Sequence, residues 1–145
     1  MPTLLCNALA LIAGCIIGGF INMAIIMVGP MLIPPPAGVD FNNAASLAKG
    51  IHLFEPRHFV APFLAHALHA FAGALITYLL AASYKLPLAL TVGAITLMGG
   101  IAASVMIPAP AWFITLDLVA AYMPMAWLGI QLGSRIQTGR STGTA

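Results

Sequence analysis

Residues 3–27, TLLCNALALIAGCIIGGFINMAIIM, form one apolar run that only Asn7 and Asn22 interrupt. A helix that crosses a bilayer needs about 20 mostly apolar residues, whereas the apolar core of a signal peptide has about 7–15. No basic residue precedes the run, as it would in a signal peptide. The stretch therefore predicts a retained transmembrane helix over about residues 3–29.

Three more apolar runs follow, at about residues 59–82, 88–107 and 112–133. Proline-containing breaks separate them, SYKLP at 83–87 and PAPAW at 108–112, and proline removes a helical hydrogen-bond donor. Each run is long enough to cross a hydrocarbon core about 30 Å thick. Short connections favour antiparallel neighbours. The sequence predicts an all-α polytopic membrane protein, a four-transmembrane-helix antiparallel bundle that makes up a single domain over residues 1–137.

The overall composition supports this class. Hydrophobic residues make up 61% of the 145 residues and charged residues 6%, and the mean hydropathy is +1.04, far from the averages of soluble domains. The net charge of +2 comes with no basic cluster, which argues against a nucleic-acid partner. We expect the lipid bilayer, further copies of the chain or other membrane subunits as partners.

One long connection, residues 30–58, joins the first two predicted spans. Its PPP at 34–36 favours an extended start, after which Asp40, Asn42 or Asn43 is a candidate cap for a short helix ending near Phe54. We expect this helix to lie at the membrane interface in an external loop.

The same loop ends in Glu55, Arg57 and His58, which are candidate interface residues. An ordered loop without a binding role is favoured over a functional lid. At the other end of the chain, the polar tail 138–145 is expected to be disordered.

The distribution of basic residues indicates an orientation. With four spans, the side that holds both termini carries Lys85, Arg135 and Arg140, and the opposite side carries Lys49 and Arg57. Basic residues are more frequent in cytoplasmic loops. Three against two favours cytoplasmic termini in a multi-pass membrane protein.

Polar residues inside the predicted spans are the candidates for function. Asn22, His66 and Asp117 each lie six to nine residues inside the same boundary, which places all three at a depth of roughly 9–14 Å. An ionised carboxylate at that depth needs a partner, so we expect His66 and Asp117 to approach each other. His69 lies one turn deeper on the same helix face.

Two histidines three residues apart also raise the possibility of a metal or haem site. A zinc site usually has four ligands, and the further candidates Asp117, His58 and His52 show no recognised spacing. Haem with two histidine ligands needs imidazoles from opposing directions, whereas all four histidines lie between residues 52 and 69.

The sulfur-containing residues offer little more. Met23, Met27 and Met31 recur every fourth residue, a spacing that suits copper(I) but is more often core packing. Cys6 and Cys15 are interpreted as small buried hydrophobes. No H-E-x-x-H, C-x-x-C, Ser/His/Asp arrangement or phosphate-binding glycine loop is present. We therefore expect no metal, no cofactor and no catalytic residues, and an enzyme is the less favoured class.

Small residues provide a packing signal. Gly14 and Gly18 form a G-x-x-x-G pair, and MGG occupies 98–100; such spacing lets helix backbones approach closely. Packing within one bundle is the default use, and a homo-oligomeric interface is the alternative.

HFVAPFLAHALHAFAGA at 58–74 and MIPAPAWFITLDLVAAYMPMAWLG at 106–129 resemble a type of small bacterial four-helix integral membrane protein without an established function. The resemblance extends to FINMAIIMVG at 20–29 and PPPAGVD at 34–40. It implies a bacterial cytoplasmic membrane and supplies no activity.

Two functional classes stay open from the sequence. The first is a structural or accessory subunit of a membrane complex or homo-oligomer, whose Asn/His/Asp layer only holds the helices together. The second is a proton-linked transporter or small-ligand-binding membrane protein that uses His66 and Asp117. The two classes differ in whether the polar layer is hydrated.

Overall fold

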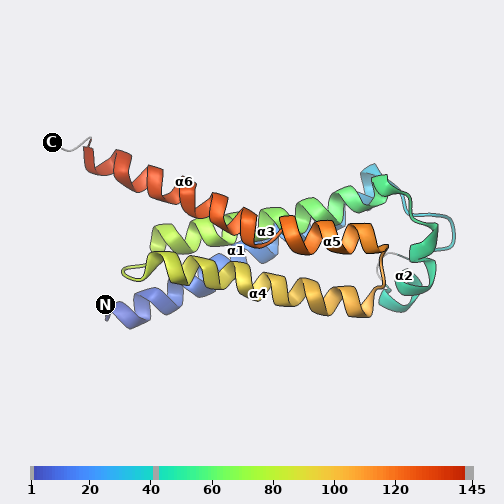
Figure 1. Ribbon diagram of the computed structural model, residues 1–145, viewed down its shortest axis with the longest axis horizontal. Helices are drawn as coiled ribbons and strands as arrows, with labels where there is room; N and C mark the ends of the chain where they lie inside the picture. Colours follow the sequence, from blue (N-terminus) through green and yellow to red (C-terminus); the bar gives the residue numbers. More distant parts are fainter. Residues whose placement is uncertain (1, 41–42, 143–145) are drawn as a thin grey trace.

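The computed structural model describes residues 2–40 and 43–142, and it is helical throughout, with no strand in that part of the chain. The elements in chain order are α1 (Thr3–Leu32), α2 (Ala44–Gly50), η1 (Ile51–Leu53), η2 (Pro56–Phe59), α3 (Val60–Leu80), α4 (Lys85–Met106), α5 (Ala111–Ala120) and α6 (Met123–Thr142). Figure 1 shows the two termini and the α3–α4 turn at one end of the molecule, and the α1–α3 connection at the other.

Four helical segments are long and apolar enough to cross a membrane, which confirms that part of the prediction. They are Thr3–Leu32, Pro56–Leu80, Lys85–Met106 and Ala111–Gly139. Most of their large apolar side chains point outward rather than into the molecule, because small residues fill the interior. This pattern suits a lipid-facing surface.

Helix α3 lies at the centre of the helix packing and makes its main contacts with α1, α4 and α6. The interior beside it is built from small side chains that let the helix axes approach closely. Its fully buried alanines are Ala65, Ala70, Ala74, Ala89, Ala121 and Ala126.

The predicted G-x-x-x-G pair packs within this one chain. A Cβ atom at Gly14 would collide with Thr77 and with the backbone of Gly73, and one at Gly18 would collide with His69. A Cβ atom at Gly19 would meet nothing within 4 Å. The Gly14–Gly18 face of α1 is therefore occupied by α3.

Asn7 fastens the start of α1 to the turn between α3 and α4. Its amide nitrogen donates to Oγ of Ser83 at 2.9 Å, and its Oδ1 accepts from the backbone nitrogens of Ala82 and Ser83 at 3.1 Å each. The turn itself holds Tyr84 in the left-handed region, with φ 49°, an unusual conformation for a residue with a side chain.

Two helix ends differ from the prediction, and a proline lies close to each. Helix α1 continues past Pro30 to Leu32, beyond the predicted end at residue 29. Helix α4 begins at Lys85 rather than at 88. Pro87 then lies in the first turn, where no intrahelical donor is needed.

The fourth apolar segment is not the single helix predicted for 112–133. It breaks at Ala121 and Tyr122 into α5 and α6. Pro124 is the second residue of α6, where its missing N–H would otherwise bond the carbonyl of Ala120 in a continuous helix.

The C-terminal end also differs from the prediction. Helix α6 continues to Thr142, so residues 138–142 are helical rather than a disordered tail. Polar residues do not by themselves end a helix. Residues 143–145 of the predicted tail lie outside the described residues.

The connection from α1 to α3 contains the short helix α2, which ends at Gly50 rather than near Phe54. Asn43 caps α2 by accepting from the backbone nitrogens of Ala45 and Ser46 at 3.0 and 3.1 Å. Of the other two candidate caps, the Asp40 backbone nitrogen donates to Oγ of Ser46 at 2.9 Å, and Asn42 lies outside the described residues. The 3-10 turns η1 and η2 then lead into α3.

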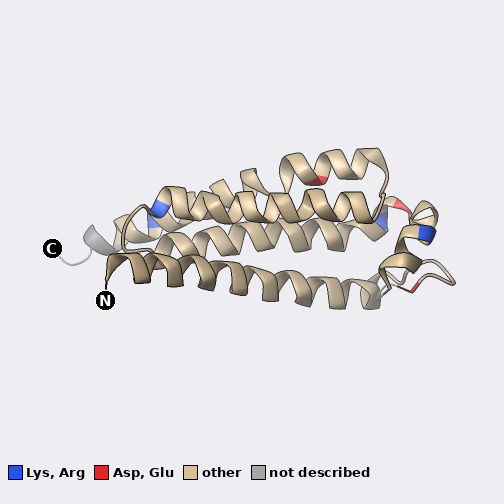
Figure 2. Cartoon of the chain, turned by 90° about the horizontal axis from the view of Figure 1, so that it is seen from below, with Lys and Arg blue, Asp and Glu red and all other residues tan. Residues whose placement is uncertain are grey.

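The charged residues are unevenly distributed along the helices. Figure 2 shows Lys and Arg gathered at the two ends of the molecule, away from the middle of the long helices. Asp117 is the exception among charged residues, because it is buried on α5 with 5% of its surface exposed. A buried carboxylate in an apolar helix needs compensating donors.

Candidate polar site at His66

His66, Asp117 and Tyr122 form one hydrogen-bonded cluster inside the molecule. Nδ1 of His66 lies 2.9 Å from both carboxylate oxygens of Asp117. The Tyr122 hydroxyl donates to Oδ2 of Asp117 at 2.8 Å and lies 3.0 Å from Nδ1 of His66. The structure thus confirms that His66 and Asp117 approach each other, and it adds a tyrosine that the depth count did not include.

Three separate elements supply these side chains. His66 is in the second turn of α3, Asp117 lies near the end of α5, and Tyr122 occupies the break before α6. The rings of His66 and Tyr122 are stacked, with centroids 5.6 Å apart and an interplanar angle of 26°. The cluster therefore ties α3 to both halves of the fourth apolar segment.

Room for the Tyr122 ring comes from Gly100 on α4. A Cβ atom at position 100 would collide with the hydroxyl and the adjacent ring carbons of Tyr122. Only 2% of the Tyr122 surface is exposed. Gly100 thus lets a large polar side chain be enclosed between α4 and α5 with its hydroxyl directed at the carboxylate.

The hydrogen-bond pattern defines the state of the histidine ring. The Tyr122 hydroxyl donates one hydrogen bond to Asp117, and the carboxylate can accept a second hydrogen bond from Nδ1–H of His66. A carboxylate that holds Nδ1–H fixes the tautomer and leaves Nε2 as the free basic nitrogen. Every hydrogen bond of the His66 ring with the described residues is at Nδ1.

Nε2 of His66 is not enclosed by the protein. Among the described residues, no fully buried side-chain nitrogen or oxygen is left without a hydrogen-bond partner, so the unpartnered Nε2 is not fully buried. The His66 side chain is 25% exposed, whereas that of Asp117 is 7% exposed. The ring therefore has a buried edge that is held by Asp117 and an accessible edge that carries a lone pair or a proton.

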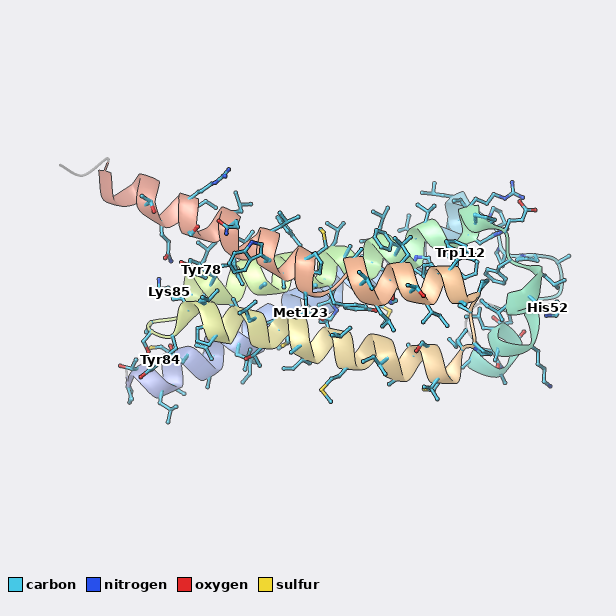
Figure 3. The ribbon with its side chains drawn as sticks, viewed as in Figure 1. His52, Tyr78, Tyr84, Lys85, Trp112 and Met123 are labelled. Carbon is cyan, nitrogen blue, oxygen red and sulfur yellow. The ribbon has the colours of Figure 1, made fainter. Side chains whose placement is uncertain are left out.

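A cavity of about 270 Å³ lies between this histidine and the α1–α3 connection. Its inner end is formed by His66, Asp117 and Gly100, and its walls are mainly apolar. The connection supplies the outer wall through Leu47, Ile51, Phe54, His58 and Phe59. Figure 3 shows the labelled Trp112 at the same end of the molecule as this connection.

A second cavity, of about 340 Å³, adjoins the first at His66. It is more polar, since Asn22, His69, Thr96 and Tyr122 all line it. His66, Gly100 and Ala103 line both cavities. His66 is thus the polar side chain that the two cavities share.

Of the predicted layer, Asn22 and His69 take different positions from the His66–Asp117 pair. Asn22 is half-buried and lines the second cavity, but no hydrogen bond joins it to the described residues. His69 packs over Gly18 of α1 and lines the same cavity. Both residues surround His66 without completing its hydrogen-bond network.

The predicted interface residues of the loop interact mainly with one another. Glu55 and Arg57 form an exposed ion pair with 3.0 Å between Oε2 and Nε. His58 is buried, accepts from the backbone nitrogen of Glu55 at 2.9 Å through Nδ1, and lines the 270 Å³ cavity. His58 therefore belongs to the cavity wall, whereas Glu55 and Arg57 lie on the surface.

The arrangement does not suggest a metal centre. Within residues 2–40 and 43–142, no three His, Cys, Asp or Glu side chains lie close enough to hold a metal ion. Cys6 and Cys15 are free thiols.

Tyr122 is the member of the cluster that sequence reasoning missed. It was counted within a continuous helix over 112–133, in which its direction could not be tied to Asp117. The signal lay in YMPM at 122–125, because a proline two residues after the tyrosine disfavours an unbroken helix.

No protein-family model matches the chain, and no curated protein and no solved structure matches it at a significant level.

Proposed function

We propose that this chain is an integral protein of a bacterial cytoplasmic membrane that binds a small ligand at His66. The observation that carries the proposal is the position of His66, whose Nδ1 is held by Asp117 while its ring lines both cavities. A histidine used only to brace helices has no need of an accessible second nitrogen. A binding site combines apolar walls with a few fixed polar groups, and this site has both.

The four long apolar helical segments support the membrane location. The exposed apolar residues along α1, which include Phe20, Met27 and Leu32 at 66–77% exposure, would be covered by lipid or by other membrane subunits. The charge bias favours cytoplasmic termini. In this orientation, the α1–α3 connection and the 270 Å³ cavity lie on the external side, with α2 at the interface.

Binding from one side is better supported than transport through the bundle. Beyond the cluster, toward the termini, the helices meet through Ala70, Ala74, Ala89 and Ala126, each with no exposed surface. A transported substrate would have to separate these contacts. Proton exchange at His66 remains part of the proposal.

A second candidate function is the accessory subunit, in which the same cluster holds helices for assembly. The observation in its favour is that Nδ1 of His66, both Asp117 oxygens and the Tyr122 hydroxyl already satisfy one another. In that case the accessible nitrogen would have no ligand, and association with other copies or subunits would be the function.

Mass spectrometry of molecules that co-purify from native membranes separates the two candidates. We expect the wild type to retain a small molecule, besides bulk lipid, that His66→Ala loses. His52→Ala is the matched control, because His52 is exposed at the loop end and outside both cavities. Size-exclusion profiles and helical circular dichroism establish that each variant is folded. An identical set of molecules in wild type and His66→Ala would support the accessory subunit instead.

A further inference from the structure

We infer that the ligand of the 270 Å³ cavity is a neutral aromatic molecule of one or two rings that carries a hydroxyl group. This inference rests on the proposed binding function and specifies its ligand class. It follows from four properties of the cavity: its size, its aromatic walls, the absence of Lys and Arg from the described residues that line it, and the hydrogen bonding of His66.

The size of the cavity limits the number of rings. An apolar cavity of about 150 Å³ in another protein holds benzene, and this cavity has about 270 Å³. A two-ring molecule is therefore the upper range. A complete acyl chain or a macrocycle is too large for the space enclosed by the α1–α3 connection.

The walls favour an aromatic ring over a flexible chain. Phe54, Phe59 and Phe113 line the cavity, and they already contact one another, with centroids 6.0 Å apart for Phe54–Phe59 and 4.6 Å for Phe59–Phe113. Aromatic pairs gain stabilisation beyond the burial of their surface. A flat ring gains these contacts while losing little conformational entropy.

The charges of the site favour a neutral ligand. No Lys or Arg is among the described residues that line either cavity, so an anion would have no permanent counter-charge. The Asp117 carboxylate is engaged by His66 and Tyr122 and offers little to a cation. Burial of an unpaired ion in an apolar cavity is costly.

His66 then determines which polar group the ligand carries. With Nδ1 directed at Asp117, Nε2 is the ring nitrogen left for a ligand, and in the tautomer with the proton on Nδ1 it accepts a hydrogen bond. A hydroxyl on the ring is the complementary donor. Because the hydroxyl must reach His66 at the inner end, the ring occupies the aromatic part of the cavity next to the connection.

Four probes test this ligand class against protein in nanodiscs, with empty nanodiscs as the background. They are 2-naphthol, naphthalene, 2-naphthalenesulfonate and 1-decanol, and isothermal titration calorimetry at pH 7 measures their affinities. We expect 2-naphthol to bind at least about fivefold more tightly than naphthalene, since one hydrogen bond contributes about 1 kcal/mol. The sulfonate and 1-decanol should bind more weakly than 2-naphthol.

Two variants separate the contribution of the hydrogen bond to affinity from that of the space in the cavity. In His66→Ala the ratio of naphthalene to 2-naphthol dissociation constants should fall to about 1, because the variant lacks the imidazole that accepts from the hydroxyl. In Ala103→Leu both affinities should fall with the ratio retained, since Ala103 lines both cavities and the cluster stays intact. His52→Ala should bind as the wild type does.

The outcomes distinguish this inference from the function on which it rests. An unchanged ratio in His66→Ala, or tighter binding of the sulfonate or of 1-decanol, overturns the aromatic hydroxyl class. If 1-decanol binds best and depends on His66, the binding function stands and the ring inference falls. If none of the probes binds and no His66-dependent molecule co-purifies, both fall.

Discussion

Gly100 on α4 lies directly against the phenol of Tyr122, so a Cβ atom at position 100 would take the space of the Tyr122 hydroxyl. That hydroxyl donates to Asp117 at 2.8 Å. Gly100, which has no side chain, thus fixes the geometry of the polar cluster. The relationship is open to a direct test, because the adjacent glycine offers a matched comparison.

We predict that Gly100→Ala destabilises the protein and Gly99→Ala does not. The first substitution forces the phenol or the helix to move, and overpacking costs about 1–3 kcal/mol. At Gly99 an added Cβ atom would meet nothing within 4 Å, so helix propensity favours alanine by up to about 1 kcal/mol. Unfolding by sodium dodecyl sulfate in mixed micelles measures both. Equal stability of the two variants would contradict the contact.

His66 and Asp117 should show strong energetic coupling. We predict that the double variant His66→Ala/Asp117→Ala loses less stability than the sum of the two single variants, by about 0.5–3 kcal/mol. Each single variant leaves a buried polar group without its partner, and the double variant removes both. A double-mutant cycle from the same unfolding titrations gives the coupling energy. Additive effects would show that the 2.9 Å contact contributes no stability.

Asn7 is predicted to matter for stability although it is remote from the cavities. Asn7→Ala removes three hydrogen bonds to Ala82 and Ser83 and should cost about 1–3 kcal/mol. Asn22→Ala is the control, with an expected change within about 0.5 kcal/mol, since no hydrogen bond joins Asn22 to the described residues. Thermal unfolding in detergent compares the two. A larger loss in Asn22→Ala would reverse our assignment of the helix-fastening residue.

Cysteine labelling tests the proposed orientation. In a background with Cys6 and Cys15 replaced by alanine, Lys49→Cys should react with a membrane-impermeant maleimide on intact spheroplasts, and Thr138→Cys should react only after lysis. Both positions are exposed and lie at opposite ends of the molecule. The reverse pattern would place the termini outside and the connection in the cytoplasm, contrary to the charge bias.

Depth counting succeeded where helices are regular. His66 and Asp117 were paired from their distances to a common boundary, and this works because an α-helix rises about 1.5 Å per residue wherever it is unbroken. Depth alone does not give the direction of a side chain around the helix. Asn22 therefore lies near His66, at the second cavity, without bonding to Asp117.

Counting residues from the membrane boundary could not predict the break between α5 and α6. Residues 112–133 are almost all apolar, so their hydrophobicity does not mark a break. A membrane helix also often tolerates proline. Only the packed structure shows that the chain turns at Ala121 and Tyr122. The small residues were interpreted correctly as packing signals, but Gly99 and Gly100 could not be told apart until the position of Tyr122 was known.

The 51-residue separation of His66 and Asp117 has a consequence for biogenesis. A chain that enters the bilayer as it is synthesised, from the N-terminus onward, inserts the imidazole of His66 with α3. The carboxylate of Asp117 follows much later, with α5. The Asp117 side chain would then meet a hydrogen-bond donor that is already in the membrane, rather than hydrocarbon alone. The earlier helices would act as a template that lowers the cost of inserting the last and least apolar segment.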